Sequence, residues 1–177
     1  EELIMEKKDL DWGNIGFSYM PTDKRYVANY KDGAWDEGGM TSDPNVVINE
    51  CAGILQYCQE IFEGLKAYTT EDGSIVTFRP DLNAERMMDS ARRLEMPPFP
   101  KERFLEAVDQ VVKANAAWVP PFGSGATLYL RPYMFATGPV IGVKPSQEYQ
   151  FRLFGTPVGP YFKGGAKPLT LCVSDFD

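Results

Sequence analysis

Apolar residues recur at helical spacing in the middle of the chain. Between about 101 and 117 they repeat every three or four positions: Phe104, Leu105, Val108, Val111 and Val112. Such a stripe predicts an amphipathic helix whose apolar face packs on a core. A second helix is predicted to open at Asp81 and to stop before Pro97 and Pro98, because proline cannot continue it. A third helical pattern runs from Cys51 to Phe62, with Gly64 as its expected end.

Segments rich in aromatic and β-branched residues predict strands. The strongest candidates are 126–135 and 150–158, and shorter ones are 46–48, 65–68 and 75–79. A further strand region, 13–30, is interrupted at 20–23. Asp32-Gly33 and Glu71-Asp72-Gly73 are turn signals between such segments. The pattern predicts an α+β fold, with a mixed or antiparallel sheet and two or three helices.

The end of the chain differs in composition from the rest. Residues 159–168 are rich in glycine and proline, which is typical of a linker. Residues 169–177 begin with an apolar, strand-like run that has no obvious partner. We expect a small N-terminal α+β domain at 1–158, an interdomain linker at 159–168, and the first strand of a truncated C-terminal domain at 169–177.

Composition excludes several classes of partner. The formal net charge is −7, the sequence pI is about 4.7, and no run of lysine and arginine occurs. An acidic surface repels nucleic acid and anionic lipid, so neither is an expected partner. The apolar runs are shorter than the roughly 20 residues that span a bilayer, and the first residues show no apolar signal-peptide core. We therefore expect a cytoplasmic protein.

The chain has no histidine and three cysteines. Without histidine there is no histidine-based triad and no histidine-containing zinc site. The spacing of Cys51, Cys58 and Cys172 fits neither a disulfide framework nor a zinc site. No phosphate-binding glycine loop or dinucleotide motif occurs. Any catalysis must then depend on carboxylates, lysine, tyrosine or a cofactor.

Four motifs occur in a particular order. The first is the segment from Tyr57 to Tyr68, YCQEIFEGLKAY, and the second is Phe78-Arg79-Pro80 followed by Asn83 and Arg86. Leu128 to Pro132, LYLRP, and Pro157 to Phe162, PVGPYF, come later. Together they resemble the N-terminal half of a branched-chain amino-acid aminotransferase, a pyridoxal-phosphate enzyme of fold type IV. The resemblance covers residues from about 12 to 177.

The resemblance implies an activity and its participants. The reaction is reversible amino transfer between leucine, isoleucine or valine and 2-oxoglutarate, with pyridoxal 5'-phosphate as cofactor and a homodimer as the assembly. The family's Schiff-base lysine follows the linker, in a part that this chain lacks. We therefore expect no catalytic residue here and no activity from the chain alone. Lys66 is expected to be solvated at a strand edge, and Glu60 and Glu63 are expected to be ordinary helix-terminal charges.

The resemblance also implies site residues. Arg86 would grip the cofactor phosphate through its guanidinium; the alternative is a surface arginine paired with Glu85 or Asp89. Tyr129 and Arg131 share one face of a strand and would hold the substrate carboxylate. The remaining residues would form an apolar substrate wall, the last three from the neighbouring subunit: Phe17, Phe62, Tyr161, Tyr57, Ile141 and Val143. Each aromatic residue taken alone is more often part of a core.

Other functions remain open at this point. A D-amino-acid aminotransferase or an aminodeoxychorismate lyase shares the fold of the resembled family. A stand-alone binding or assembly module that has lost catalysis is a third possibility. The exposed strand expected near 169–173 argues against the module, because a free strand edge invites aggregation.

Overall fold

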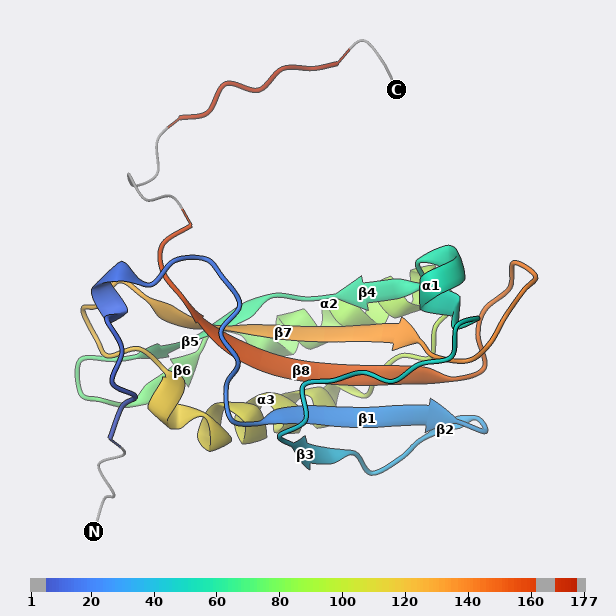
Figure 1. Ribbon diagram of the computed structural model, residues 1–177, viewed down its shortest axis with the longest axis horizontal. Helices are drawn as coiled ribbons and strands as arrows, with labels where there is room; N and C mark the ends of the chain where they lie inside the picture. Colours follow the sequence, from blue (N-terminus) through green and yellow to red (C-terminus); the bar gives the residue numbers. More distant parts are fainter. Residues whose placement is uncertain (1–5, 162–167, 175–177) are drawn as a thin grey trace.

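The computed structural model describes residues 6–161 and 168–174. Within these residues, eight strands form one antiparallel sheet accompanied by three α-helices and two short 3-10 helices (Figure 1). The elements before the long helices are η1 (Trp12–Asn14), β1 (Arg25–Lys31), β2 (Ala34–Trp35), β3 (Gly39–Thr41), α1 (Gly53–Tyr57), β4 (Glu60–Phe62), β5 (Leu65–Thr69) and β6 (Ile75–Thr77). They are followed by α2 (Pro80–Arg93), α3 (Lys101–Ala114), η2 (Ala116–Trp118), β7 (Thr127–Ala136) and β8 (Tyr149–Val158). The predicted α+β class is confirmed.

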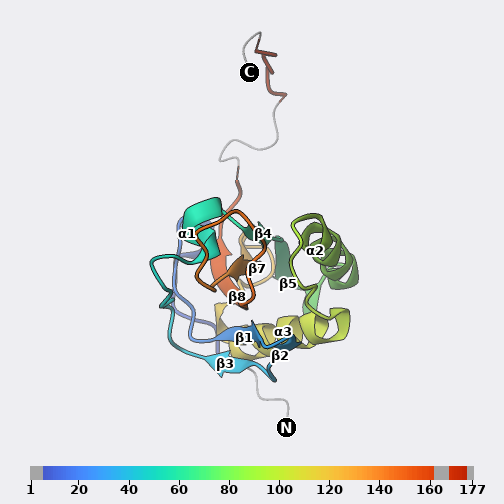
Figure 2. The ribbon, with the colours of Figure 1, turned by 90° about the vertical axis from the view of Figure 1, so that its right-hand side faces the viewer.

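The hairpin of β7 and β8 is the centre of the sheet. The strand order is β2-β1-β8-β7-β5-β6, with β3 paired to β1 and β4 paired to β7. The two central strands pair along their full length, from Thr127 opposite Val158 to Ala136 opposite Tyr149. Figure 2 shows α2 and α3 along one side of the sheet, whereas the chain between β3 and α1 runs along the other side.

Alternation along β7 divides the sheet into a core face and an open face. Leu128, Leu130 and Met134 are completely buried, and each such side chain contributes about 1.5–3 kcal/mol through burial. They meet the apolar stripe of α3 and the buried residues of α2 in one core. Tyr129 and Arg131 lie between them in sequence and are only half-buried, because successive strand residues point to opposite faces. The open face therefore carries the polar and aromatic residues.

The helix predicted from Cys51 to Phe62 is wrong in most of its length. Helix α1 covers only Gly53–Tyr57, because Cys58 adopts a left-handed conformation with φ 53° and its N–H bonds the Ile54 carbonyl at 3.1 Å. Such a residue ends a helix. The chain then turns into β4, where Ile61 pairs with Met134 of β7.

Other local predictions have mixed outcomes. The Asp32-Gly33 turn is confirmed: both residues have positive φ, 53° and 83°, and they join β1 to β2. The helix predicted at Asp81 is confirmed as α2, and α3 ends at Ala114, slightly before the predicted end. No strand forms at 46–48 or in 13–24, because these segments run outside the sheet and bond it at single points, as Met20 N does with Thr156 Oγ1 at 2.8 Å.

The predicted linker and second domain lie at the edge of what the structure describes. Residues 162–167 and 175–177 are outside the described residues, and 168–174 form no strand. The division into a small domain, a linker and a further strand stays a prediction. In the described part of the chain, no helix is long and apolar enough to cross a membrane.

Candidate functional site

Tyr129 and Arg131 meet on the open face of β7, as the sequence predicts. Arg131 donates a hydrogen bond from Nε to the Tyr129 hydroxyl at 3.0 Å. Its guanidinium carbon lies 4.5 Å from the centre of the Phe62 ring and 5.2 Å from that of Tyr129. The cation is therefore held by two aromatic rings, while its remaining N–H groups are available to an anion.

Two further predicted residues extend this cluster. The Phe17 ring lies 5.3 Å from the Tyr161 ring, nearly perpendicular to it, and 6.3 Å from the Tyr129 ring. The segment that carries Phe17 is attached to the end of β8 by a hydrogen bond from Gly159 N to Gly16 O at 3.0 Å. A Cβ at Gly159 would collide with the Ile15 carbonyl, so glycine permits this close approach.

We call the group of Phe17, Phe62, Tyr129, Arg131 and Tyr161 the open-face cluster. Its aromatic rings are well exposed for such large side chains, with Phe17 at 54%, Phe62 at 60% and Tyr161 at 72%. These rings are not part of the core. They form an apolar surface beside a cation.

Tyr57, Ile141 and Val143 lie at the other end of β7. The Tyr57 hydroxyl donates to the Ile141 carbonyl, and both Ile141 and Val143 are exposed. The chain just after Tyr57 contacts the last residue of β7, where Ala136 N bonds Gln59 O at 3.1 Å. Tyr129 lies near the first residue of the same strand. The structure thus groups Tyr57 with the 141–143 loop but not with the open-face cluster.

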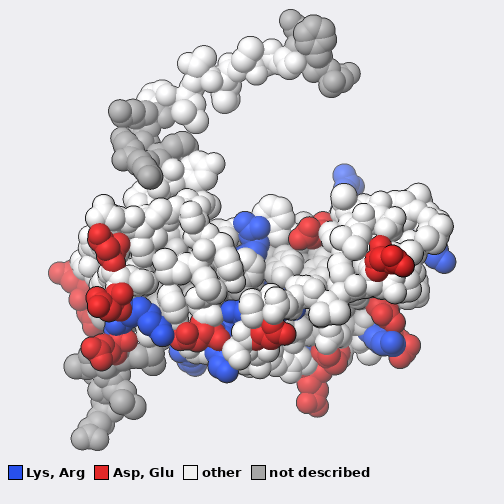
Figure 3. Space-filling model, in the orientation of Figure 1, with Lys and Arg blue, Asp and Glu red and all other residues white. Residues whose placement is uncertain are grey.

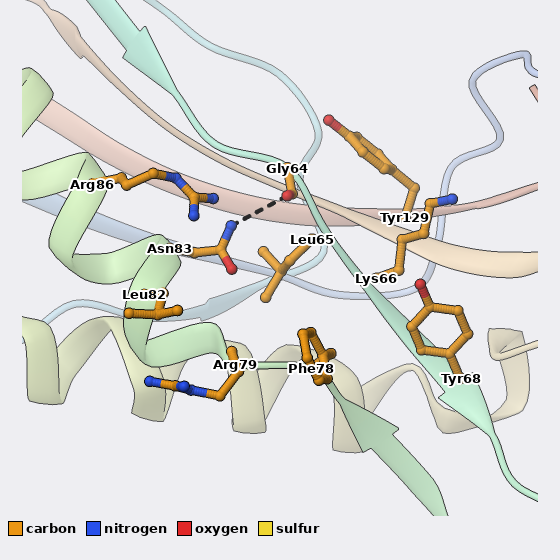
Figure 4. A pocket seen from close by; sticks show the side chains of 10 residues that line it. All are labelled: Gly64, Leu65, Lys66, Tyr68, Phe78, Arg79, Leu82, Asn83, Arg86 and Tyr129. Atoms are coloured by element: carbon orange, nitrogen blue, oxygen red, sulfur yellow. Dashed lines mark hydrogen bonds between the residues drawn. The ribbon is translucent and has the colours of Figure 1, made fainter.

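Arg86 and Tyr129 line the same cavity, which has a volume of about 400 Å³ (Figure 4). Its wall comes from β5, β7, α2 and the turn before α2. Three of the lining residues are cationic and none is acidic: Gly64, Leu65, Lys66, Tyr68, Phe78, Arg79, Leu82, Asn83, Arg86 and Tyr129. A cavity with this lining is suited to an anion. On the face of the molecule that Figure 3 shows, acidic and basic residues are mixed, and neither kind forms a continuous patch.

Arg86 is paired with Glu63, and this partner was not predicted. Its Nε donates to Glu63 Oε1 at 3.2 Å and its Nη2 to Oε2 at 2.8 Å. The hydrogen bonds that Arg86 donates to Glu63, together with the negative charge of that carboxylate, raise the pKa of the Arg86 guanidinium. The predicted alternative partners are engaged elsewhere, Glu85 with Lys101 and Asp89 with Arg92.

Glu63 also binds the buried Asn83 of α2. Asn83 Nδ2 donates to Glu63 Oε2 at 2.8 Å and to the Gly64 carbonyl at 3.2 Å. The Glu63 side chain is only 11% exposed, so the expectation of an ordinary helix-terminal charge is wrong. The sequence pattern gives no signal for this contact, because Glu63 follows β4 and its partners Asn83 and Arg86 lie on α2, and the two elements become neighbours only in the fold.

Lys66 lies on β5 between β6 and β7, opposite Tyr129, and its side chain is half-buried. The pairing of β5 with β6 begins one residue later, at Ala67, so Lys66 has a cross-strand partner only on β7, and its half-buried side chain is less solvated than expected. Gly64, just before β5, leaves space for the Tyr129 side chain. An added Cβ there would lie 2.6 Å from the Tyr129 hydroxyl, so the glycine leaves room for that ring.

Arg79 adopts a left-handed conformation with φ 47° just before α2. It bonds Asp81 from Nε to Oδ1 at 2.9 Å and from Nη2 to Oδ2 at 2.7 Å. These bonds hold the pKa of the Asp81 carboxyl down at about 2.

In the described residues, no group of histidine, cysteine, aspartate and glutamate side chains could hold a metal ion.

Known proteins share both the sequence and the fold. The chain is 54% identical over 170 residues to a branched-chain-amino-acid aminotransferase of Haemophilus influenzae, covering 96% of this chain and 50% of that protein. It is 48% identical over 158 residues to the corresponding Helicobacter pylori protein, covering 89% and 46%. The chain thus spans about half the length of these curated relatives. No protein-family model matches the chain.

Solved structures confirm the fold. The branched-chain aminotransferase of Thermoproteus uzoniensis, solved with norvaline, superposes with a TM-score of 0.64 at 22% identity and covers 80% of this chain and 43% of its own. That of Escherichia coli gives a TM-score of 0.60 at 23% identity, covering 79% and 41%. The shared small-domain fold agrees with the high sequence identity of the curated relatives. The chain belongs to the branched-chain-amino-acid aminotransferase family.

Proposed function

We propose that a protein containing this chain catalyses reversible amino transfer between leucine, isoleucine or valine and 2-oxoglutarate, with pyridoxal phosphate as cofactor. The observation that carries the proposal is the shared position of Tyr129. Its ring belongs to the open-face cluster and also lines the cationic cavity that includes Arg86. A substrate carboxylate and a cofactor phosphate would therefore bind next to each other, with Tyr129 between them.

The cavity fits the phosphate of the cofactor by the chemistry of its donors. Arg86, Lys66 and Arg79 surround it, and a guanidinium binds phosphate oxygens through charge-assisted hydrogen bonds. Glu63 occupies Nε and one N–H of Nη2, which leaves the other N–H groups of Arg86 for phosphate. When bound, pyridoxal phosphate supplies an electron sink for charge at the reacting carbon. This chain would contribute grip and orientation.

The open-face cluster fits the substrate. Arg131 and Tyr129 would bind the carboxylate, since their mutual hydrogen bond keeps a cation and a hydroxyl close together. Phe17, Phe62 and Tyr161 would cover the aliphatic side chain. Apolar pockets discriminate by only about 1–3 kcal/mol per methylene group, which supports use of all three branched-chain amino acids.

The remaining assignments concern the assembly. We assign Tyr57, Ile141 and Val143 to the active site of the second subunit in a homodimer, located in the cytoplasm. Their exposure at the far end of the sheet from the open-face cluster supports this assignment. Because the 141–143 loop is exposed and lies away from the open-face cluster of its own chain, it would be placed to cover the site of a second subunit.

The test uses a full-length protein that contains this chain, loaded with pyridoxal phosphate. We expect 2-oxo acids to form from L-leucine, L-isoleucine and L-valine when 2-oxoglutarate is present, and little turnover of D-alanine. Preferential turnover of D-alanine, or release of pyruvate from aminodeoxychorismate, would assign the protein to a related fold type IV enzyme. An absence of turnover with every donor would favour a binding or assembly module.

A further inference from the structure

A second cavity of about 400 Å³ lies on the open face of the sheet, beside the open-face cluster. Its floor comes from β1, β7 and β8, and Pro44 and Asn45 form part of its rim. Figure 1 shows the chain between β3 and α1 crossing in front of β8, where this rim is found. The two sites are neighbours on this face and share no residue: Arg131 lies opposite Phe154, and Tyr133 lies opposite Arg152.

Two buried arginines line this cavity. Arg25 is 4% exposed and Arg152 is 6% exposed. Arg25 bonds the carbonyls of Ser42 at 3.1 Å and Thr22 at 2.7 Å. Within residues 6–161 and 168–174, neither arginine forms an ion pair with a carboxylate.

Arg152 is bound in the same manner, by uncharged acceptors. It donates to the carbonyls of Asn45 and Asp43 and to Gln150 Oε1, each at 3.1 Å. Buried charges in proteins are normally paired. Two guanidinium groups that share a cavity and face only neutral oxygens therefore form an unneutralised positive site in a chain whose net charge is −7.

The carboxylate of Asp43, whose charge interacts with both arginines, forms its hydrogen bonds with other groups. Asp43 accepts hydrogen bonds from the backbone and side chain of Asn45 at 2.9 and 2.8 Å. Those bonds are the main reason that the pKa of Asp43 is lowered, and the charges of Arg152 and Arg25 contribute less. Its field reaches the arginines, but it makes no ion pair with them.

One donor of the site has no acceptor at all. Arg25 Nε is enclosed, and no hydrogen-bond partner lies near it in the described part of the chain. Buried N–H groups almost always have a partner, and each guanidinium carries more N–H donors than the bonds given above use. The Nε itself is closed off by protein atoms, so a ligand in the cavity would bind the terminal N–H groups of Arg25 and Arg152 that the bonds above leave unused.

The other walls are aromatic. The centre of the Phe154 ring lies 5.8 Å from that of Tyr19 and 6.0 Å from that of Tyr133, and both rings are nearly perpendicular to it. Tyr133 is half-buried, and burial raises the pKa of its phenol, so it stays neutral and adds no negative charge. A ligand in this cavity would therefore meet two cations and three aromatic rings, with Tyr133 directly beside Arg152 in the strand register.

We propose that the cavity between Arg25 and Arg152 binds a small organic carboxylate with an apolar or aromatic body, at a site separate from the proposed substrate site. Guanidinium groups bind carboxylates through paired, charge-assisted hydrogen bonds, and the rings of Tyr19, Tyr133 and Phe154 cover the apolar body. The inference does not depend on the proposed transaminase activity, because it uses neither Arg131 nor Arg86.

Benzoate is the probe, and benzamide is its uncharged counterpart. Calorimetric titration is made with the full-length protein carrying Arg131→Gln, so that binding at the proposed substrate site does not contribute. We expect one benzoate site per chain and no detectable benzamide binding. Adding Arg152→Gln should weaken the binding of benzoate by at least about tenfold, because a hydrogen bond to a charged group is lost. Adding Arg92→Gln, a matched exposed arginine, should change nothing.

A second variant protects the test against misfolding. Tyr19 is 60% exposed, so Tyr19→Ala should fold, as circular dichroism would show, and should still weaken benzoate severalfold by removing one wall. An absence of benzoate binding in the Arg131→Gln protein, or equal binding after Arg152→Gln, would overturn the proposal. Self-association that is lost on Arg152→Gln without any benzoate binding would also overturn it, by showing that a second copy fills the cavity. Turnover of L-leucine by the full-length protein with Arg131 intact tests the proposed function separately from these binding results.

Discussion

Glu63 holds Arg86 by two hydrogen bonds, from Nε to Oε1 at 3.2 Å and from Nη2 to Oε2 at 2.8 Å. The arginine proposed to bind phosphate is thus oriented before any ligand arrives. Glu63 is itself fixed by Asn83, a buried residue of α2. A fixed guanidinium loses less conformational entropy on binding than a free one, so the pair favours phosphate binding beyond the charge that it carries.

Loss of the Arg131 charge should weaken substrate binding. Arg131→Gln in the full-length protein should raise the KM for L-leucine by about 10- to 100-fold, because a hydrogen bond to a charged group is lost. Tyr129→Phe should raise KM only severalfold, since the cation remains and only the hydroxyl that Arg131 Nε bonds is removed. Steady-state kinetics measures both. Equal effects of the two variants would contradict the assignment of the carboxylate to Arg131.

A methyl group at Gly64 should disturb the site more than the fold. The added Cβ would lie 2.6 Å from the Tyr129 hydroxyl, the movable end of a side chain, so the free energy of unfolding should fall by only about 1 kcal/mol, the low end of the cost of overpacking. The displaced ring should raise the KM for L-leucine severalfold. Gly39→Ala is the matched control, because a Cβ there meets open space. An unchanged KM in Gly64→Ala would show that the position of Tyr129 is not critical.

Asp81 should make stability depend on pH in the acid range. Its pKa is held at about 2 in the folded chain, chiefly by the hydrogen bond from Arg79, against about 3.9 when unfolded. A depressed pKa stabilises the fold above about pH 4, and this contribution disappears as pH falls from about 4 to about 2. Urea unfolding should therefore show Asp81→Asn less stable than the unmodified chain at pH 5 but equal to it near pH 2. A difference that is constant with pH would contradict this linkage.

Glycine at position 58 should stabilise the fold. Cys58 has a φ of 53° at the end of α1, where a side chain is strained and glycine is not. After the larger conformational entropy of unfolded glycine is counted, Cys58→Gly should raise the free energy of unfolding by about 0.5–1 kcal/mol. Cys51→Gly, at a position without positive φ, should lower it. Denaturant unfolding of the two variants decides the matter.

Sequence patterns predicted the elements whose signal is local. The apolar stripe of α3 and the alternation along β7 both correspond to one buried face, and the turn at Asp32 and Gly33 follows from its residue types. Helix α1 was overpredicted because Ile61 and Phe62 continue the helical spacing, whereas their pairing with β7 favours a strand. Pairing between distant segments has no local signal.

In the candidate site, too, local contacts were predicted from the sequence and long-range contacts were not. Alternation alone predicts that Tyr129 and Arg131 share a face, and their hydrogen bond confirms it. The pairing of Glu63 with Arg86 and the cavity between Arg25 and Arg152 depend on which strands and helices become neighbours. Spacing along the chain gives no indication of those contacts, and Glu63 was expected to be an ordinary helix-terminal charge.

The most direct test of the account is a titration of the full-length apoprotein with pyridoxal phosphate, followed by absorbance, for the unmodified protein and for Arg86→Gln and Arg92→Gln. We predict that Arg86→Gln weakens the binding of pyridoxal phosphate by at least about tenfold and leaves the affinity for unphosphorylated pyridoxal unchanged. Arg92→Gln should change neither affinity. Pyridoxal phosphate binding by Arg86→Gln that matches the unmodified protein would contradict the assignment of Arg86 to the phosphate.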